Sequence, residues 1–149
     1  MDTADFGIAK EEFPMIKVIM GLKGSGKTKQ LISAIQDAVA NESGDIVCIE
    51  YGKKLTYDVN YKVRLVDSEE CGITNVDMLK GLLSGLHAGN FDITHVFIDN
   101  LYKTIGHNHD YGEEFIEWCA KFSEANNVKI TMTVSDDPAN ASEAIKQYL

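Results

Sequence analysis

Hydrophobic and polar positions along the chain alternate between two kinds of pattern. Short β-branched apolar runs, typical of buried strands, are separated by longer stretches in which apolar residues recur every three or four positions, as on one face of a helix. The predicted strands are 16–20, 46–49, 93–98 and 128–134, with a short extra strand within 62–66. The predicted helices begin at Thr28, at Val76 and near Phe115, and a short one closes the chain. This alternation indicates an α/β fold, a single three-layer α/β/α domain around a mainly parallel sheet of about five strands.

Three segments lack these patterns. Residues 1–14 are acidic with little periodicity, so we interpret them as a flexible N-terminal tail and 15–149 as the folded domain. The stretch 51–60 is polar with scattered aromatic residues, and 103–112 is a predicted loop that would act as a lid or a partner contact. Part of this loop has a composition that would suit a metal, but its compact spacing matches no established ligand pattern and no third cluster supports it. The residues in question are His107, Asn108, His109 and Asp110.

Composition narrows the class of protein. With 149 residues, 44% of them hydrophobic, the chain can bury one core and is too short for two ordinary domains. A net charge of -9 and a pI near 4.8 leave no general basic surface, which disfavours nucleic-acid binding. Cys48, Cys71 and Cys119 form no C-x-x-C pair, as expected of reduced thiols in a cytosolic protein without structural zinc. No apolar run approaches the ~20 residues of a membrane span and no signal-peptide pattern opens the chain, so we expect a soluble, cytoplasmic protein.

Residues 21–28, Gly-Leu-Lys-Gly-Ser-Gly-Lys-Thr, fit the Walker A phosphate-binding pattern G-x-x-x-x-G-K-[ST], with a predicted strand before and a helix after. The glycines let successive backbone N–H groups converge on phosphate oxygens at a helix N-terminus. Lys27 would reach the β and γ phosphates, and the Thr28 hydroxyl would ligate Mg²⁺. The alternative is a glycine-rich turn that precedes Lys-Thr by chance. The predicted nucleotide-binding residues are Gly21, Leu22, Lys23, Gly24, Ser25, Gly26, Lys27 and Thr28.

Polar residues end the other predicted strands, and ligands of parallel sheets bind beyond the carboxyl ends of the strands. Asp99 suits an acid that holds magnesium through its water shell, and the alternative is a turn or cap aspartate. Glu50 is placed to accept a proton from water attacking the γ phosphate, and the alternative is an ordinary surface glutamate. Thr133, included among the nucleotide-binding residues, and Ser135 would sense the γ phosphate or orient water, or else cap the next turn. Because Asn100 follows Asp99, a base glutamate adjacent to the magnesium aspartate is absent.

Arg64 is the only arginine in the chain. Planar bidentate stabilisation of a transferring phosphate must come from Arg64 if this chain type supplies it, so the predicted catalytic residues are Glu50, Lys27 and Arg64. Lys53 and Lys54 are the next candidates, although a solvated loop with scattered charge explains them as well.

With the loop at 21–28, the aspartate at 99 and the polar-ended strand at 128–135, the chain resembles P-loop NTPases, and among them the RecA-like branch. The resemblance covers residue 15 to the C-terminus, and only the phosphate loop within it is highly specific. It implies that one strand of the sheet lies between the two strands that carry the nucleotide motifs. It also implies a catalytic role for Glu50, whose place after the phosphate-loop helix matches that of the base in several members. The chain is similar, too, to small stand-alone bacterial P-loop ATP-binding proteins, often labelled twitching-motility-like, which implies a shared nucleotide core.

The expected function is that of a magnesium-dependent ATP-binding protein with slow or partner-stimulated hydrolysis, a weak ATPase. ATP is preferred to GTP because no N-K-x-D guanine signature is present. One alternative is a small-molecule kinase, against which the single arginine counts. Another is a non-catalytic nucleotide-sensing interaction module that passes its nucleotide state to a protein partner. The chain would also be able to form a homo-oligomer, in which Arg64 or a lysine of one copy completes the site of its neighbour.

Overall fold

The computed structural model describes residues 14–149, so all of the expected tail except Pro14 lies outside the described residues. These residues form five strands, five α-helices and one 3-10 turn, with strands and helices largely in alternation, as the apolar pattern predicts. In chain order the elements are β1 (Ile16–Gly21), α2 (Lys27–Asn41), β2 (Asp45–Glu50), β3 (Arg64–Asp67), α3 (Val76–Gly89), β4 (Ile93–Ile98), α4 (Leu101–Ile105), α5 (His109–Asn126), β5 (Lys129–Ser135), the 3-10 turn η1 (Pro138–Asn140) and α6 (Glu143–Lys146).

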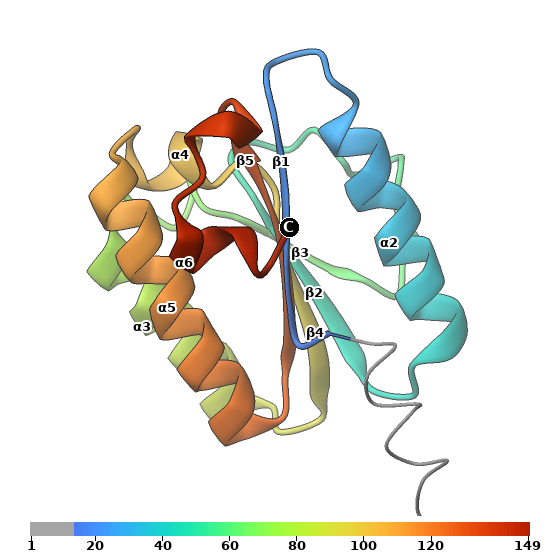
Figure 1. Cartoon of the computed structure of the whole chain (residues 1–149). Coiled ribbons are helices and arrows are strands. Elements are labelled where there is room, and N and C mark those ends of the chain that lie inside the picture. The colour runs from blue at the N-terminus through green and yellow to red at the C-terminus, as the bar shows by residue number, and fades with distance from the viewer. Residues whose placement is uncertain (1–13) are drawn as a thin grey trace, which may run out of the picture.

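The five strands form one parallel sheet in the order β1-β5-β4-β2-β3. β5 therefore lies between β1, which leads into the predicted phosphate loop at 21–28, and β4, which ends just before Asp99. This order confirms the strand arrangement that the RecA-like resemblance implies. Because every pairing is parallel, all carboxyl ends lie at one end of the sheet, together with the phosphate loop (Figure 1).

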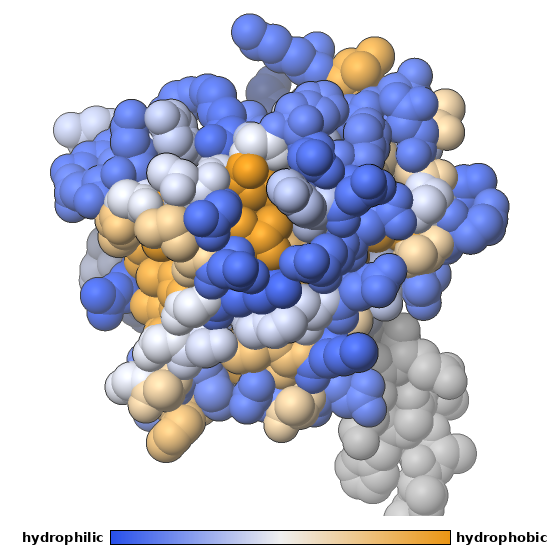
Figure 2. All heavy atoms as spheres, turned by 90° about the vertical axis from the view of Figure 1, so that its left-hand side faces the viewer, coloured by the Kyte–Doolittle hydropathy of each residue, from blue (hydrophilic) through white to orange (hydrophobic). Residues whose placement is uncertain are grey.

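Helices cover both faces of the sheet, with α2 on one face and α3, α5 and α6 on the other (Figure 1). The helical spacing explains this, since α2 buries the stripe Leu31, Ile35 and Ala38 against the sheet. On α5 the residues at helical spacing are buried at Phe115 and Cys119 but only half-buried at Trp118 and Phe122. The outer surface on the α3 and α5 side is mostly hydrophilic, and apolar patches interrupt it (Figure 2). No helix among residues 14–149 combines the length and hydropathy that crossing a membrane requires.

The predicted loop at 103–112 is wrong in part. α4 continues to Ile105 and α5 begins at His109, which leaves only residues 106–108 between them. Asn100 and Asn108 cap the two helices, their side chains accepting hydrogen bonds from the backbone N–H groups of Lys103 and Tyr111. Asparagine caps and a one-turn helix carry little apolar periodicity, so the pattern gives no sign of them.

The edge of β1 is covered by the C-terminal residues. The backbone N–H of Val18 donates to the carbonyl of Tyr148 at 2.8 Å, and α6 lies beside β1 in Figure 1. Ile145 of α6 is buried in the core cluster that also contains Val18. The end of the chain thus occupies hydrogen-bonding positions that an open sheet edge would expose.

Candidate functional site: a lysine-rich cavity at the phosphate loop

The phosphate loop joins β1 to α2 through two glycines with positive φ, Gly24 at 83° and Gly26 at 90°. Side chains rarely adopt this backbone conformation, which explains why the sequence places glycine there. The Lys27 ammonium donates to the carbonyl of Leu22 at 3.0 Å and so closes the loop across its own turn. Among the described residues no side chain caps the N-terminus of α2, and its first turn carries no acidic residue. The first N–H groups of α2 are therefore available to an anion.

A cavity of about 500 Å³ opens beside this loop. Five of the chain's fourteen lysine and arginine residues line it, although the whole chain has a net charge of -9. Asp99 is the only carboxylate on the same walls within residues 14–149. A polyphosphate is the kind of ligand that such concentrated positive charge stabilises. The lining lysines are Lys23, Lys27, Lys29, Lys54 and Lys103, and the remaining lining residues include Thr28, Tyr51, Asn100, Thr133 and Ser135.

Asp99 and Thr133 meet across the neighbouring strands β4 and β5. The Thr133 hydroxyl donates to Asp99 Oδ1 at 3.1 Å and accepts from the backbone N–H of Asn100 at 2.6 Å. This contact fixes Asp99 Oδ1 and leaves Oδ2 without a hydrogen bond among residues 14–149. An exposed hydroxyl on Thr28 and a half-buried carboxylate on Asp99 are hard oxygen donors in one cavity. The donor set present fits Mg²⁺, which prefers such ligands.

Glu50 lies at the carboxyl end of β2, with only 3% of its surface exposed, but it is not among the residues that line the cavity. Its Oε1 accepts from the backbone N–H groups of Lys54 and Leu55, at 2.9 and 3.1 Å. Burial raises the pKa of the Glu50 carboxyl, an effect that these two hydrogen bonds oppose and that the nearby Asp99 charge reinforces. Glu50 thus anchors the start of the 51–60 segment in this structure.

Arg64 lies apart from the phosphate loop. It begins β3, pairs with Val47, and lines a separate cavity between β2, β3 and α3. The carboxyl end of β3, which faces the phosphate-loop end of the sheet, is Asp67. The structure therefore does not bring Arg64 together with Lys27 and Asp99 within one chain.

The positive charge that we expected from Arg64 is absent from the cavity lining, which instead includes two lysines from outside the phosphate loop and its helix. Lys54 lines the cavity, whereas Lys53 points into a 2.8 Å ion pair with Glu70. Lys103, which the sequence analysis missed, reaches the same cavity from α4, and the Lys54 ammonium beside it lowers the pKa of Lys103. Only the strand order and the position of α4 bring these lysines together, so no local sequence signal reveals the pair.

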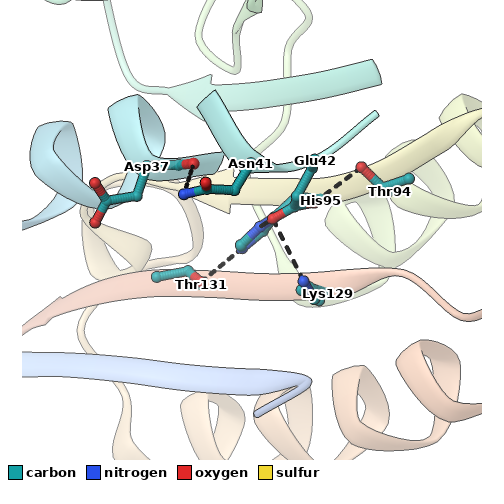
Figure 3. A network of polar contacts seen from close by, with 7 residues as sticks. All are labelled: Asp37, Asn41, Glu42, Thr94, His95, Lys129 and Thr131. Atoms are coloured by element: carbon teal, nitrogen blue, oxygen red, sulfur yellow. Dashed lines mark hydrogen bonds and ion pairs between the residues drawn. The ribbon is translucent and has the colours of Figure 1, made fainter. Parts of the chain in front are cut away.

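A larger cavity, of about 640 Å³, lies between α2 and the β1–β5 side of the sheet, near a buried polar network (Figure 3). In this network His95 contacts Glu42 through Nδ1 and Thr131 through Nε2, both at 2.8 Å. Glu42 also accepts from Thr94 and pairs with Lys129. This cavity contains no phosphate-loop residue, and three of its charged or titratable residues, Glu42, His95 and Lys129, already contact one another. The smaller cavity at the phosphate loop therefore remains the candidate site.

Comparisons with known proteins bear on the fold. No family model and no curated protein matches the chain. Among solved structures, it is similar to the flagellar accessory protein FlaH from Methanocaldococcus jannaschii, with a TM-score of 0.56 and 11% sequence identity. The match covers 98% of this chain and 73% of that chain. At this identity the likeness shows a shared fold alone, a parallel α/β domain.

Proposed function

We propose that the chain is a magnesium-dependent ATP-binding protein with slow or partner-stimulated ATP hydrolysis. The observation that carries the proposal is the single cavity lined by Lys27, Thr28 and Asp99 at the carboxyl end of a parallel sheet. Residues 21–28 would cradle the phosphates with backbone N–H groups, and Thr28 and Asp99 would hold the magnesium, which neutralises phosphate charge when bound. Thr133 keeps Asp99 in place and would respond to the γ phosphate through it.

Lys54 and Lys103 would supply the positive charge that an arginine provides elsewhere. Both line the same cavity as the phosphate-loop residues, and a bound anion would relieve their mutual repulsion. An ammonium group contacts phosphate as a point charge without bidentate geometry, which is consistent with slow turnover. Arg64 would contribute only to the site of a neighbouring copy, because it lines a different cavity of its own chain.

Glu50 would act as the base that accepts a proton from the attacking water. Its raised pKa brings the carboxyl closer to the range in which it takes up a proton. In this structure its Oε1 is shared by two backbone N–H groups, so the 51–55 segment must shift before Glu50 can contact water at the γ phosphate. Because of this step, the isolated protein would hydrolyse ATP slowly, and a partner that moves the 51–55 segment would accelerate hydrolysis.

A second candidate, a non-catalytic nucleotide sensor, is favoured by the same observation on Glu50. With its carboxylate bound to the loop and no glutamate next to Asp99, the site would bind nucleotide without activating water. Nucleotide would then change the position of the 51–55 segment, and a protein partner would recognise that change.

Thermal shift and hydrolysis measured across nucleotides, with and without magnesium and at several protein concentrations, test the proposal. Magnesium-ATP should raise the melting temperature, and phosphate release should be slow. If copies complete one another's sites, the rate of phosphate release per chain should increase with protein concentration. Stabilisation without any phosphate release would select the sensor.

Lys27→Ala provides the decisive variant. It should abolish the ATP-dependent thermal shift, because it removes the ammonium that closes the loop and that would contact the phosphates. Lys53→Ala is the matched control, since Lys53 lies outside the cavity in an exposed ion pair, and it should bind ATP like the wild type. Unchanged ATP affinity in Lys27→Ala would reject the phosphate-loop assignment.

A further inference from the structure

Three potential metal ligands from distant parts of the sequence converge beside the nucleotide cavity. His107 comes from the link between α4 and α5, His109 is the first residue of α5, and Asp136 directly follows β5. One ligand atom from each lies within 4.8 Å of the others. In the sequence the compact spacing of residues 107–110 and the lack of a supporting cluster disfavour a metal site, whereas the fold brings Asp136 from farther along the chain to the two histidines.

Asp136 is held so that one carboxylate oxygen faces the histidines. Its Oδ1 accepts from the backbone N–H of Asp137 at 2.8 Å and from the Asn140 amide at 3.0 Å. Its Oδ2 is buried and has no hydrogen bond among residues 14–149, although only 7% of the residue is exposed. A buried carboxylate oxygen without a hydrogen bond is costly, which indicates that a group absent from the protein chain satisfies it. Hydrogen bonds on the far oxygen are the usual means of orienting a metal-binding carboxylate.

The contacts between these ligands have the spacing of donors around an ion. His109 Nε2 lies 2.9 Å from Asp136 Oδ2, close enough for a hydrogen bond, yet its N–H is not aligned with that oxygen. Two donors bound to one zinc ion at about 2.0–2.2 Å lie roughly 3.0–3.5 Å apart, each pointing at the ion and not at the other. His107 Nε2, at 4.0 Å from the same oxygen, is on a side chain exposed enough to close the remaining distance.

The rings are also supported from behind. Tyr102 stacks on His107 with centroids 4.5 Å apart and meets the edge of the His109 ring at 6.0 Å. Gly112 leaves the space that Tyr102 occupies, because a Cβ atom there would approach the Tyr102 ring to 3.0 Å. A packed aromatic ring limits the positions of both imidazoles and lowers the entropy lost on binding an ion.

We propose that His107, His109 and Asp136 form a site for a divalent transition-metal ion of the zinc class. Two imidazoles and one carboxylate suit such an ion, and exposure of both histidines leaves room for water to complete its coordination. The site connects to the nucleotide cavity, since the backbone N–H of Asp136 donates to the carbonyl of Gly21 at 3.1 Å. A bound ion would fasten the α4–α5 link to the turn beside the phosphate loop. Metal binding at these three residues does not require ATP.

Titration of the full chain, without a histidine tag or nucleotide, by Co²⁺ and Zn²⁺ tests the site. A Cys71→Ser background removes the exposed thiol as a competing ligand. We expect one ion per chain, visible Co²⁺ bands without thiolate charge transfer, and a higher melting temperature. His109→Gln and Asp136→Asn should each weaken binding at least about 100-fold, the upper range for disturbing even the surroundings of a metal.

Matched controls separate the site from unspecific binding. His87→Gln removes a histidine of α3, and Asp110→Asn removes the same charge as Asp136→Asn from an exposed neighbour of the loop. Both should bind Co²⁺ like the wild type, and so should Lys27→Ala, which distinguishes this site from the nucleotide site. If Asp136→Asn fails to fold, the variants His107→Gln and His109→Gln still test the site, because both histidine side chains are exposed. Absence of one-to-one binding, or equal binding by His109→Gln, would overturn the proposal.

Discussion

Lys54 and Lys103 each contribute positive charge to the candidate site. They line the same cavity, and the ammonium of Lys54 lowers the pKa of Lys103. We expect Lys54→Ala and Lys103→Ala each to weaken ATP binding roughly tenfold, as for the loss of one charge-assisted hydrogen bond, with a smaller effect on AMP. Isothermal titration at low and high salt measures this, and the loss should shrink with salt. Equal affinities for ATP in Lys54→Ala, Lys103→Ala and Lys53→Ala would contradict it.

Glu50 offers a test of chemistry at the same scale. Glu50→Gln keeps an acceptor for the N–H groups of Lys54 and Leu55 but removes the proton acceptor. We expect ATP affinity to stay within a few-fold and phosphate release to fall at least about 100-fold, the lower range for losing a general base. Single-turnover hydrolysis separates the two effects, with exposed Glu124→Gln as the control. Wild-type turnover in Glu50→Gln would restrict Glu50 to anchoring the loop.

Some site residues could be anticipated from the sequence because their signals are local. Asp99 and Thr133 each end an apolar run, and a parallel sheet brings such ends together. Lys103 and Asp136 could not be anticipated, because their roles depend on which helix and which turn come next to the phosphate loop. The hydrogen bond from the Lys54 backbone N–H to Glu50 could not be anticipated either, because it depends on side-chain geometry and not on residue spacing.

Among the elements, the phosphate loop depends on a backbone conformation that glycine alone adopts easily. Gly26→Ala places a side chain at φ 90°, a left-handed conformation that costs about 1–2 kcal/mol, and turns N–H groups away from the phosphates. We expect a lower melting temperature and at least about tenfold weaker ATP binding. Gly81→Ala is the matched control, since Gly81 lies in α3 with open space around its Cα. That variant should be stabilised by about 0.5–1 kcal/mol in urea unfolding with unchanged ATP binding.

Elements with apolar periodicity were predictable, and those made by caps were not. The strands follow from short continuous apolar runs that are buried on both faces, and the three long helices follow from apolar residues at helical spacing. α4 is a single turn whose start is set by the Asn100 side chain, and the start of α5 is set by Asn108. Neither asparagine differs locally from a loop residue, so a loop was expected where two helices meet.

For the whole molecule, the polar network of His95 and Glu42 ties the C-terminal end of α2 to β4 and β5 (Figure 3). The Glu42 carboxylate only accepts hydrogen bonds, so His95 Nδ1 donates to it and Nε2 accepts from Thr131. Burial lowers the pKa of His95 despite the hydrogen bond and charge of Glu42, so the folded protein keeps this imidazole neutral. The unfolded chain takes up that proton more readily, which links proton uptake to unfolding.

Stability should therefore fall as pH decreases from about 6.5, the ordinary histidine value, toward the lower pKa of folded His95. Glu42 acts in the same direction at lower pH, because its hydrogen bonds and the neighbouring charges lower its pKa despite burial, and its contribution is lost below about 4.5. Glu50 opposes this trend: burial raises its pKa in the folded protein, so acidification from that raised pKa down to about 4.5 favours the folded state.

His95→Gln isolates the histidine contribution to this pH dependence. It should cost about 1–3 kcal/mol at pH 7.5, because one of the buried partners Glu42 and Thr131 loses its hydrogen bond. It should also lose less stability than the wild type between pH 7.5 and 5.5, since glutamine takes up no proton. Urea unfolding midpoints at both values, with His87→Gln as the control, measure the difference. An identical pH dependence in His95→Gln and the wild type would show that other groups set the acid limit of this fold.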